Sequence, residues 1–535
     1  MRNFILFLTL LMTTNQIWSQ NNSFPIEWGE LQRSPGSLVE VLPKSKIDFF
    51  SVRWSGNGLM GTYRLVSHEN LSILLQKRIK TVTETGYSNF ETAFYFGEQL
   101  IVIMSDRSGN EMSLYSQRYS EELEPISTAE KIATYSNNRL SARPEFKLYQ
   151  SQNRKFIGVV WEIQGKGNTN DIYGYSIINE KMKIIQSGEY VLPFDGNMST
   201  INDHHISNNG TYILCVTEHN HAVDKMFSRS YDNYKALHLY KINSGQLREF
   251  KIQVEGLRID DLQINSNDST FCTLTAIYGK GFKNGIEGMV FAKIDTQLDS
   301  VVTQGVVKFG GEITMQRWND NWNDNTWNQN NNFASPAITN NNLNQSNYYT
   351  YKLRDLFVLE DGSMVGSMEE YYLYRRVNFD NRTGTSSNIL YYYYDDIIAF
   401  KIGSNGILEW QKRIEKNQVS MNDGGPYSSY CSFTDGKSLH FIFNDNSRNY
   451  SDEGVFVQND RRVYPFNLSR RKNAAALASI EIGTGLSYRK TLFTRQEVDV
   501  LVVPKLFKID FVLKEILMYS INGTKERFGV LYYGK

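Results

Sequence analysis

The sequence predicts an all-β protein, a β-propeller of seven or eight four-stranded antiparallel blades in one domain over residues 20–535. Three observations favour this fold. One hairpin recurs along the chain, a second hairpin precedes most of its copies, and successive units start about 40 to 75 residues apart. A lone four-stranded sheet cannot bury both of its faces, so such units must stack, and a closed ring leaves none uncovered.

The recurring hairpin has a first strand that ends in Lys-Ile or a close equivalent, then a polar turn and a second amphipathic strand. Clear copies are residues 237–242 with the turn 243–245, and residues 397–402 with the turn 403–406. The strand after the turn repeats as well: residues 76–79 and 411–414 have the same sequence, Gln-Lys-Arg-Ile. This recurrence indicates an internal repeat.

The second hairpin consists of an apolar strand, a tight turn rich in Asn, Asp and Gly, and another apolar strand. Its clearest copies span residues 206–212, 264–271, 359–364 and 433–438. Two hairpins make one four-stranded unit, and seven such units fit from about residue 38 to residue 493. The strands expected after residue 505 either form an eighth blade or help to close the ring.

Single hairpins resemble known propeller repeats. The hairpin Lys401–Trp410 resembles the repeats of quinoprotein-like propellers, and Phe433–Lys437 is similar to the repeats of TolB-type and WD40-like propellers. The resemblance implies a propeller fold. Only one repeat has the tryptophan, so the resemblance implies no quinone, and we expect no cofactor.

Two segments stand apart from the repeats. Arg2, the apolar run Phe4–Met12 and a polar stretch ending at Ser19 form the pattern of a secretory signal peptide, whose apolar core is too short to span a bilayer. We therefore expect residues 1–19 to be a signal peptide. The Asn-rich stretch 319–347 is of low complexity and predicts a surface insertion between the fifth and sixth units.

The composition excludes some classes of function and of site. Lys and Arg number 57, as do Asp and Glu, and this charge balance argues against a general electrostatic role on nucleic acid. The three cysteines, Cys215, Cys272 and Cys431, lie in apolar segments that resemble β-strands. We expect them to be buried thiols rather than a disulfide framework.

Histidine is scarce, yet His204, His205, His219 and His221 fall within one unit. The hairpin geometry places His219 roughly 13 Å or more along the strand from the position opposite His204, so the four do not converge. His219 and His221 share one strand face and are the weak candidates for a metal site. We expect no bound metal.

Paired acids at Asp260-Asp261 and Asp395-Asp396 invite comparison with the two carboxylates of glycoside hydrolases. Neighbouring residues of a strand point to opposite faces, so neither pair can flank a single bond. A cross-blade carboxylate pair, with acids from two different blades, stays open as an alternative. The Gly-x-Ser-x-Gly nucleophile motif is absent, and we assign no catalytic residue.

Two regions are candidates for binding a partner. The sixth unit is rich in tyrosine, with Tyr372 and Tyr374 in one strand, and tyrosine is favoured at interfaces because it buries a large area and keeps a hydroxyl group. A basic segment follows in the seventh unit and contains the remaining candidates, Arg461, Arg462, Arg470 and Arg471. Such a segment can grip an anionic partner.

These observations lead to a functional hypothesis. We expect a non-catalytic, exported β-propeller that binds another protein, as an accessory or plug subunit of a bacterial envelope complex for outer-membrane export. Its architecture and size are similar to those of a plug or accessory subunit of a type IX secretion translocon. We expect a periplasmic location, with the cell surface and exterior left open. The alternative is a propeller that binds or hydrolyses carbohydrate.

We predict that residues 1–19 are removed and that the mature protein begins at Gln20, because the small Ser19 suits the last position of a signal peptide. Mass analysis of the N-terminal peptide of the exported protein checks this. A retained Met1 or an acylated N-terminus would overturn the predicted export.

Overall fold

The computed structural model describes residues 24–534 except for the gaps 58–59, 85, 138–142, 164–168, 223–232, 244, 267–269, 280–285, 311–349, 381–384 and 459–462. The predicted signal peptide 1–19 and the predicted insertion 319–347 lie outside the described residues, as do Arg461 and Arg462. In the part that is described, no helix has the length and apolar character needed to cross a membrane.

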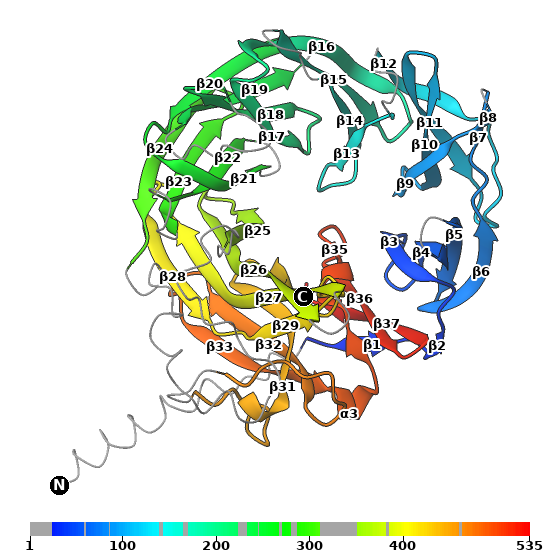
Figure 1. Ribbon diagram of the computed structural model, residues 1–535, viewed down its shortest axis with the longest axis vertical. Helices are drawn as coiled ribbons and strands as arrows, with labels where there is room; N and C mark the ends of the chain where they lie inside the picture. Colours follow the sequence, from blue (N-terminus) through cyan, green and yellow to red (C-terminus); the bar gives the residue numbers. More distant parts are fainter. Residues whose placement is uncertain are drawn as a thin grey trace, which may run out of the picture.

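The described strands form eight sheets of at least four strands, arranged as the blades of a closed ring (Figure 1). This confirms the predicted all-β propeller and fixes the blade number at eight. The first four blades are made of β3 (Ser37–Pro43), β4 (Phe49–Asn57), β5 (Met60–Glu69) and β6 (Ser72–Arg78); β9 (Asn89–Phe96), β10 (Gln99–Ser108), β11 (Glu111–Tyr119) and β12 (Glu130–Ser136); β13 (Lys147–Gln150), β14 (Phe156–Ile163), β15 (Asn170–Asn179) and β16 (Ile184–Asp195); and β17 (Ser199–Ile206), β18 (Tyr212–His219), β19 (Tyr234–Asn243) and β20 (Gln246–Gln253). A two-stranded ribbon, β7 (Val82–Thr83) and β8 (Gly86–Tyr87), connects the first two blades.

The next three blades repeat this plan, with one extra strand in the sixth. They are made of β21 (Arg258–Ser266), β22 (Phe271–Gly279), β23 (Ile286–Asp295) and β24 (Ser300–Lys308); β25 (Thr350–Val358), β26 (Met364–Asp380), β27 (Thr385–Ile402), β28 (Leu408–Ile414) and β29 (Gln418–Met421); and β30 (Tyr430–Thr434), β31 (Ser438–Asn446), β32 (Asn473–Glu481) and β33 (Ser487–Thr494). The first strand of each blade lies at the centre of the ring, where β17, β21 and β25 are in contact.

The repeated hairpins occupy fixed places in the blades. The Lys-Ile hairpin joins the third and fourth strands, as in β19–β20 and β27–β28, and the second hairpin joins the first and second strands, as in β17–β18 and β30–β31. The turns need left-handed backbone at Gly210 and Gly406, each with φ of 81°. Glycine adopts this conformation without steric cost, which is why these turns were recognisable in the sequence.

The eighth blade combines the two ends of the described chain. Its inner and central strands come from the C-terminal part: β34 (Leu501–Val502), β35 (Lys508–Asp510), β36 (Glu515–Asn522) and β37 (Lys525–Tyr532). Its outer strands come from the N-terminal part: β1 (Ile26–Trp28) and β2 (Gln32–Arg33), both paired antiparallel with β37. The C-terminal strands therefore form a blade, and residues 26–33, to which the sequence assigned no strand, close the ring.

The apolar core lies between neighbouring blades. One cluster joins the fourth and fifth blades and includes Cys215, Leu239, Cys272 and Leu274, all at most 1% exposed. Cys431 is buried in a second cluster, and the three cysteines are free thiols, as predicted. Burial raises the pKa of all three. Each blade covers an apolar face of the next blade, so the ring must close to keep the outer faces of the first and last blades away from water.

A buried ion pair fastens the closure. Arg53 on β4 donates to both carboxylate oxygens of Glu526 on β37, at 2.7 and 2.8 Å, and both side chains are fully buried. Glu526 also accepts hydrogen bonds from the hydroxyl groups of Ser34, at 2.8 Å, and Tyr519, at 3.3 Å. One carboxylate thus ties the first blade, the eighth blade and the N-terminal segment together.

We expect Glu526→Gln to lower the free energy of unfolding by about 3–5 kcal/mol, because it leaves the buried Arg53 guanidinium without its counter-charge. The matched control is Glu124→Gln, which breaks the exposed pair with Lys77 and should cost less than about 1 kcal/mol. Urea unfolding measures both values. Equal effects of the two changes would show that the buried pair does not hold the ring closed.

Candidate protein-binding arm

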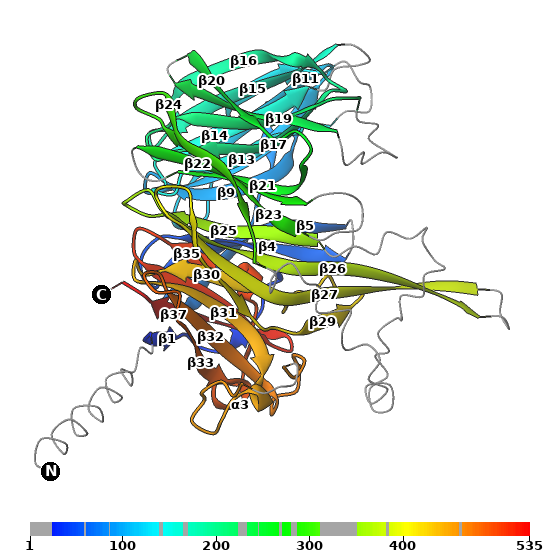
Figure 2. The same ribbon diagram turned by 90° about the vertical axis from the view of Figure 1, so that its left-hand side faces the viewer.

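The sixth blade carries a hairpin that extends well beyond the ring (Figure 2). Strands β26 and β27 have 17 and 18 residues; β25 pairs with β26 as far as Tyr371, and β28 pairs with β27 over Ile397–Ile402. The outer part of this hairpin, residues 371–380 paired with 385–394, is the segment we call the arm. At its root, β29 pairs with Tyr391–Tyr394 and adds a third strand.

Tyrosine rings pack along one face of the arm. Tyr372 lies 6.3 Å from Tyr374 and 5.6 Å from Tyr393, and Tyr374 lies 5.9 Å from Tyr391, measured between ring centroids. Tyr372 is 5% exposed, whereas Tyr374 is only half-buried. Of the two predicted partner-binding tyrosines, Tyr372 therefore stiffens the arm, and Tyr374 has surface available for contact.

Both faces of the arm expose apolar surface near its root. Leu373 is 42% exposed on the face opposite to Tyr372, and Met421 of β29, whose register partner is Tyr391, is also 42% exposed. Lys505 lies over the Tyr394 ring at 3.8 Å and donates to the Gly425 carbonyl at 2.7 Å, which clamps the root to the eighth blade. The arm thus projects from a firmly held root that presents two exposed apolar side chains and the half-buried ring of Tyr374.

A buried ionic cluster fixes the root on the side of the seventh blade. Glu369 accepts hydrogen bonds from Lys416 at 2.8 Å, from Arg354 at 2.6 Å and from the Ser429 hydroxyl at 2.7 Å. Lys416 also donates to Gln418 at 2.9 Å, so the cluster holds β29 in place. Burial opposes ionisation of Glu369, but Lys416 and Arg354 outweigh it and lower the pKa of this carboxyl.

A second cluster lies on the other side of the same strands. Glu370 accepts from the Tyr351 hydroxyl at 2.6 Å, and Arg413 lies 3.3 Å from Glu370 and 2.9 Å from Asp396. Burial, reinforced by the charge of Asp396, raises the pKa of Glu370 to about 7. Strand alternation turns these consecutive carboxyls to different surroundings, and the register of β26 shifts between Glu369 and Tyr371, at the point where the arm leaves the blade.

Sequence reasoning named Asp395 and Asp396 but missed Glu369 and Glu370. The carboxylate pair that forms is Glu370 with Asp396, on two neighbouring strands of the sixth blade, and it is not the cross-blade pair that the sequence left open. Both residues are 6% exposed, and Arg413 bridges them. The coincidence of two adjacent acids in each strand of one long hairpin was the available clue.

The basic segment of the seventh blade is only partly described. Arg470 lies 3.2 Å from Asp499, with 58% of its side chain exposed, and Arg471 is exposed. Tyr464 is 45% exposed, and the Arg448 guanidinium lies 5.9 Å from the centre of its ring. The described part therefore presents cations beside an exposed aromatic ring.

The two predicted metal-ligand candidates, His219 and His221, have different environments. His219 is buried, with one ring nitrogen 3.0 Å from the Thr200 hydroxyl and the other 3.2 Å from the Asn233 carbonyl. His221 is exposed. Among the described residues, no group of three or more His, Cys, Asp and Glu side chains is placed to hold a metal ion.

The other acidic pair serves the fold. Asp260 pairs with Arg258 of its own strand, at 2.6 and 2.7 Å. Asp261 accepts from the backbone N–H groups of Leu262 and Leu353, both at 2.9 Å, and so joins the fifth and sixth blades. As the alternation predicted, the two carboxylates point to different surroundings.

No family model matches the chain, and no curated protein matches it. Similar solved structures include the WD40 domain of SCAP from fission yeast, at 9% identity and a TM-score of 0.33 over 97% of this chain and 96% of that one. The β-propeller domain of the Trilobed protease from Pyrococcus furiosus has 10% identity and a TM-score of 0.31 over 71% and 96%. The strand pairing within the chain itself shows the eight blades.

We expect the two root carboxyls to make opposite contributions to stability as a function of pH. The pKa of Glu370 is raised on folding, so its contribution is present below pH 4.5 and is lost as the pH rises through about 7. The pKa of Glu369 is lowered, so its contribution is present above pH 4.5 and is lost as the pH falls. Between pH 5 and pH 8, the cost of Glu370→Gln should therefore shrink by on the order of 2–3 kcal/mol.

The matched control is Glu369→Gln, which removes a counter-charge from Lys416 and Arg354 and should cost more at pH 7 than at pH 4. Urea unfolding of the three proteins across this pH range measures the profiles. Parallel profiles for both variants and the wild type would contradict the assignment.

Proposed function

We propose that this protein is a non-catalytic, exported propeller that binds another protein through the arm, as an accessory or plug subunit of a bacterial envelope complex for outer-membrane export. The observation that carries the proposal is the arm itself: a hairpin projecting from the ring, with exposed apolar side chains and a half-buried tyrosine near a root held by buried charges.

The arm has the properties of a good binding element. Leu373, Met421 and Tyr374 offer the aliphatic and aromatic contacts that dominate the centres of protein interfaces. Packed tyrosines and two ionic clusters restrict the motion of the root, so little conformational entropy is lost on binding. The basic segment of the seventh blade supplies a charged rim for an anionic partner.

The proposed cellular location depends on the predicted signal peptide. The signal-peptide pattern of residues 2–19 supports export, and a periplasmic site suits a ring that acts on an envelope complex. The Glu370–Asp396 pair does not support the carbohydrate-hydrolysing alternative, because Arg413 contacts both carboxyls and the Tyr351 hydroxyl donates to Glu370.

Site-specific crosslinking tests the arm as the contact surface. A photo-crosslinking amino acid in place of Leu373 should attach one envelope protein in native cells, which mass spectrometry identifies. The same probe in place of Leu247, an equally exposed position on the outer strand β20 at 44%, is the control and should attach none. Equal labelling from both positions would show that the arm is not the interface.

With that partner in hand, the double change Leu373→Ser and Tyr374→Ser should weaken its affinity at least tenfold, because each removes exposed apolar area from a rigid element. Replacing Arg470 and Arg471 by Ser should weaken binding less and reduce its dependence on salt. Leu247→Ser should leave affinity unchanged. Calorimetric titration gives the constants, and wild-type affinity in the double variant would remove the arm from the interface.

A further inference from the structure

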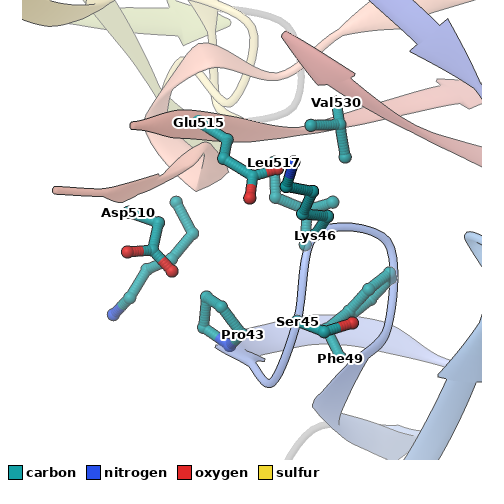
Figure 3. Close-up of a pocket in the computed structure, with 9 residues that line it drawn as sticks. Pro43, Ser45, Lys46, Phe49, Asp510, Glu515, Leu517 and Val530 are labelled. Carbon is teal, nitrogen blue, oxygen red and sulfur yellow. The ribbon is translucent and has the colours of Figure 1, made fainter. Parts of the chain in front are cut away.

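A hollow lies between the first and eighth blades. It is enclosed by the turn that follows β3 and by the β35–β36 hairpin (Figure 3). Its space for a guest is about 10 Å³, enough for one group the size of a water molecule. Most of its wall is apolar and comes from Pro43, Phe49, Leu517 and Val530.

One carboxyl group in this hollow has no protein partner. Glu515 is 3% exposed and points into the hollow, and neither of its side-chain oxygens has a hydrogen-bond partner among the described residues. Asp510 is its register partner on β35, so both carboxyls lie on one face of the hairpin. A buried carboxylate without a partner is costly, which makes Glu515 an exception that needs a ligand.

The neighbouring charges are already engaged, apart from one lysine. Arg154, from the third blade, lies 2.5 Å from Asp510, and Lys508 lies 3.5 Å from Glu40. Lys46 is exposed in the turn that lines the hollow and makes no ion pair in the described part of the chain.

The tyrosines next to the hairpin are also engaged. Tyr532, the register partner of Glu515 on β37, donates to Glu27 at 2.9 Å, and Tyr533 donates to the Asp510 carbonyl at 3.2 Å. The Lys46 side chain extends toward Glu515 and its charge acts on that carboxyl, but no hydrogen bond or ion pair joins the two, so Glu515 has no donor among the described residues.

We propose that the hollow binds a single primary ammonium group, with Glu515 as its acceptor, supplied either by a lysine side chain of a partner protein or by a free alkylamine. An ammonium group brings three N–H donors and a positive charge in about the volume of a water molecule. The carbon stem behind it would lie against the apolar wall that Phe49 and Leu517 form.

Other ligands fit less well. A guanidinium group is planar and larger than the space, and two carboxyls side by side repel an anion. Calcium requires six to eight oxygen ligands, whereas one oxygen of Asp510 already faces Arg154. A primary ammonium group meets the size, charge and hydrogen-bonding requirements together.

Binding should depend on pH, because only ionised Glu515 attracts the ligand. Burial, with a smaller contribution from the charge of Asp510, raises the pKa of Glu515 to about 7, while Lys46 and Arg154 oppose this shift. A carboxyl with that pKa is about one-tenth ionised at pH 6 and nine-tenths ionised at pH 8. Affinity for an alkylammonium ion should therefore be about tenfold lower at pH 6.

Thermal unfolding of the full chain tests the site, since a ligand that binds only the folded state raises the midpoint. At pH 8, n-butylammonium chloride should raise the midpoint more than tetramethylammonium chloride at the same concentration, because the second ion has no N–H donor. Glu515→Gln should abolish this difference, while Glu255→Gln, at an exposed position far along the chain, should keep it.

The outcomes of this experiment distinguish a partner's lysine from a free amine, and both of these from occupation of the hollow by Lys46. Displacement of butylammonium by a lysine-containing peptide at lower concentration would identify a partner's lysine as the ligand, and no displacement would identify a free amine. Absence of the difference in the wild type, or its survival in Glu515→Gln, would overturn the proposal. A difference seen only in Lys46→Met would also overturn it, by showing that Lys46 fills the hollow itself.

Discussion

The contact between the first and eighth blades is the constraint on which the ring depends. Every apolar cluster lies between blades, so a ring open at one seam would expose the faces on both sides of it. Arg53 and Glu526 close that seam although 473 residues separate them in sequence. Loop-closure entropy grows only slowly with length, so short outer strands such as β1 and β2 suffice once a charge-assisted contact fixes them.

Buried ion pairs lie at two places where apolar packing alone does not fix how one part of the fold is oriented against another. Sheet faces covered with Val, Ile and Leu tolerate small displacements against each other, whereas an ion pair away from water tolerates few. At the seam, Arg53 sets how the first blade meets the last. At the arm, Glu369 and Glu370 set how a hairpin leaves the sixth blade. Each cluster costs desolvation energy and gives a defined geometry in return.

Local features made the fold predictable, and contacts between distant segments limited the prediction of the site. Turns such as the one at Gly406 and strand alternation are written in a few neighbouring residues, so the hairpins were recognisable. Residues 26–33 were not, because β1 is three residues long and its partner lies at the opposite end of the chain. Tyr372 is buried and Tyr374 is half-buried, although they lie two residues apart on one face of the arm. The difference reflects how far each residue lies from the ring, and strand alternation in the sequence predicts only that the two share a face.

The arm and the hollow use carboxyl groups in opposite ways. At the arm, Lys416, Arg354 and Ser429 satisfy Glu369 within the chain, so the cluster has no capacity left for a ligand and acts as a rigid support. In the hollow, Arg154 satisfies Asp510 and leaves Glu515 without a donor. Glu526 and Glu369 are buried acids with ion-pair partners, whereas Glu515 has none in the described part of the chain, so an apolar residue in its place should raise the stability of the fold. The presence of Glu515 there is best explained by a guest that brings the missing donor and charge.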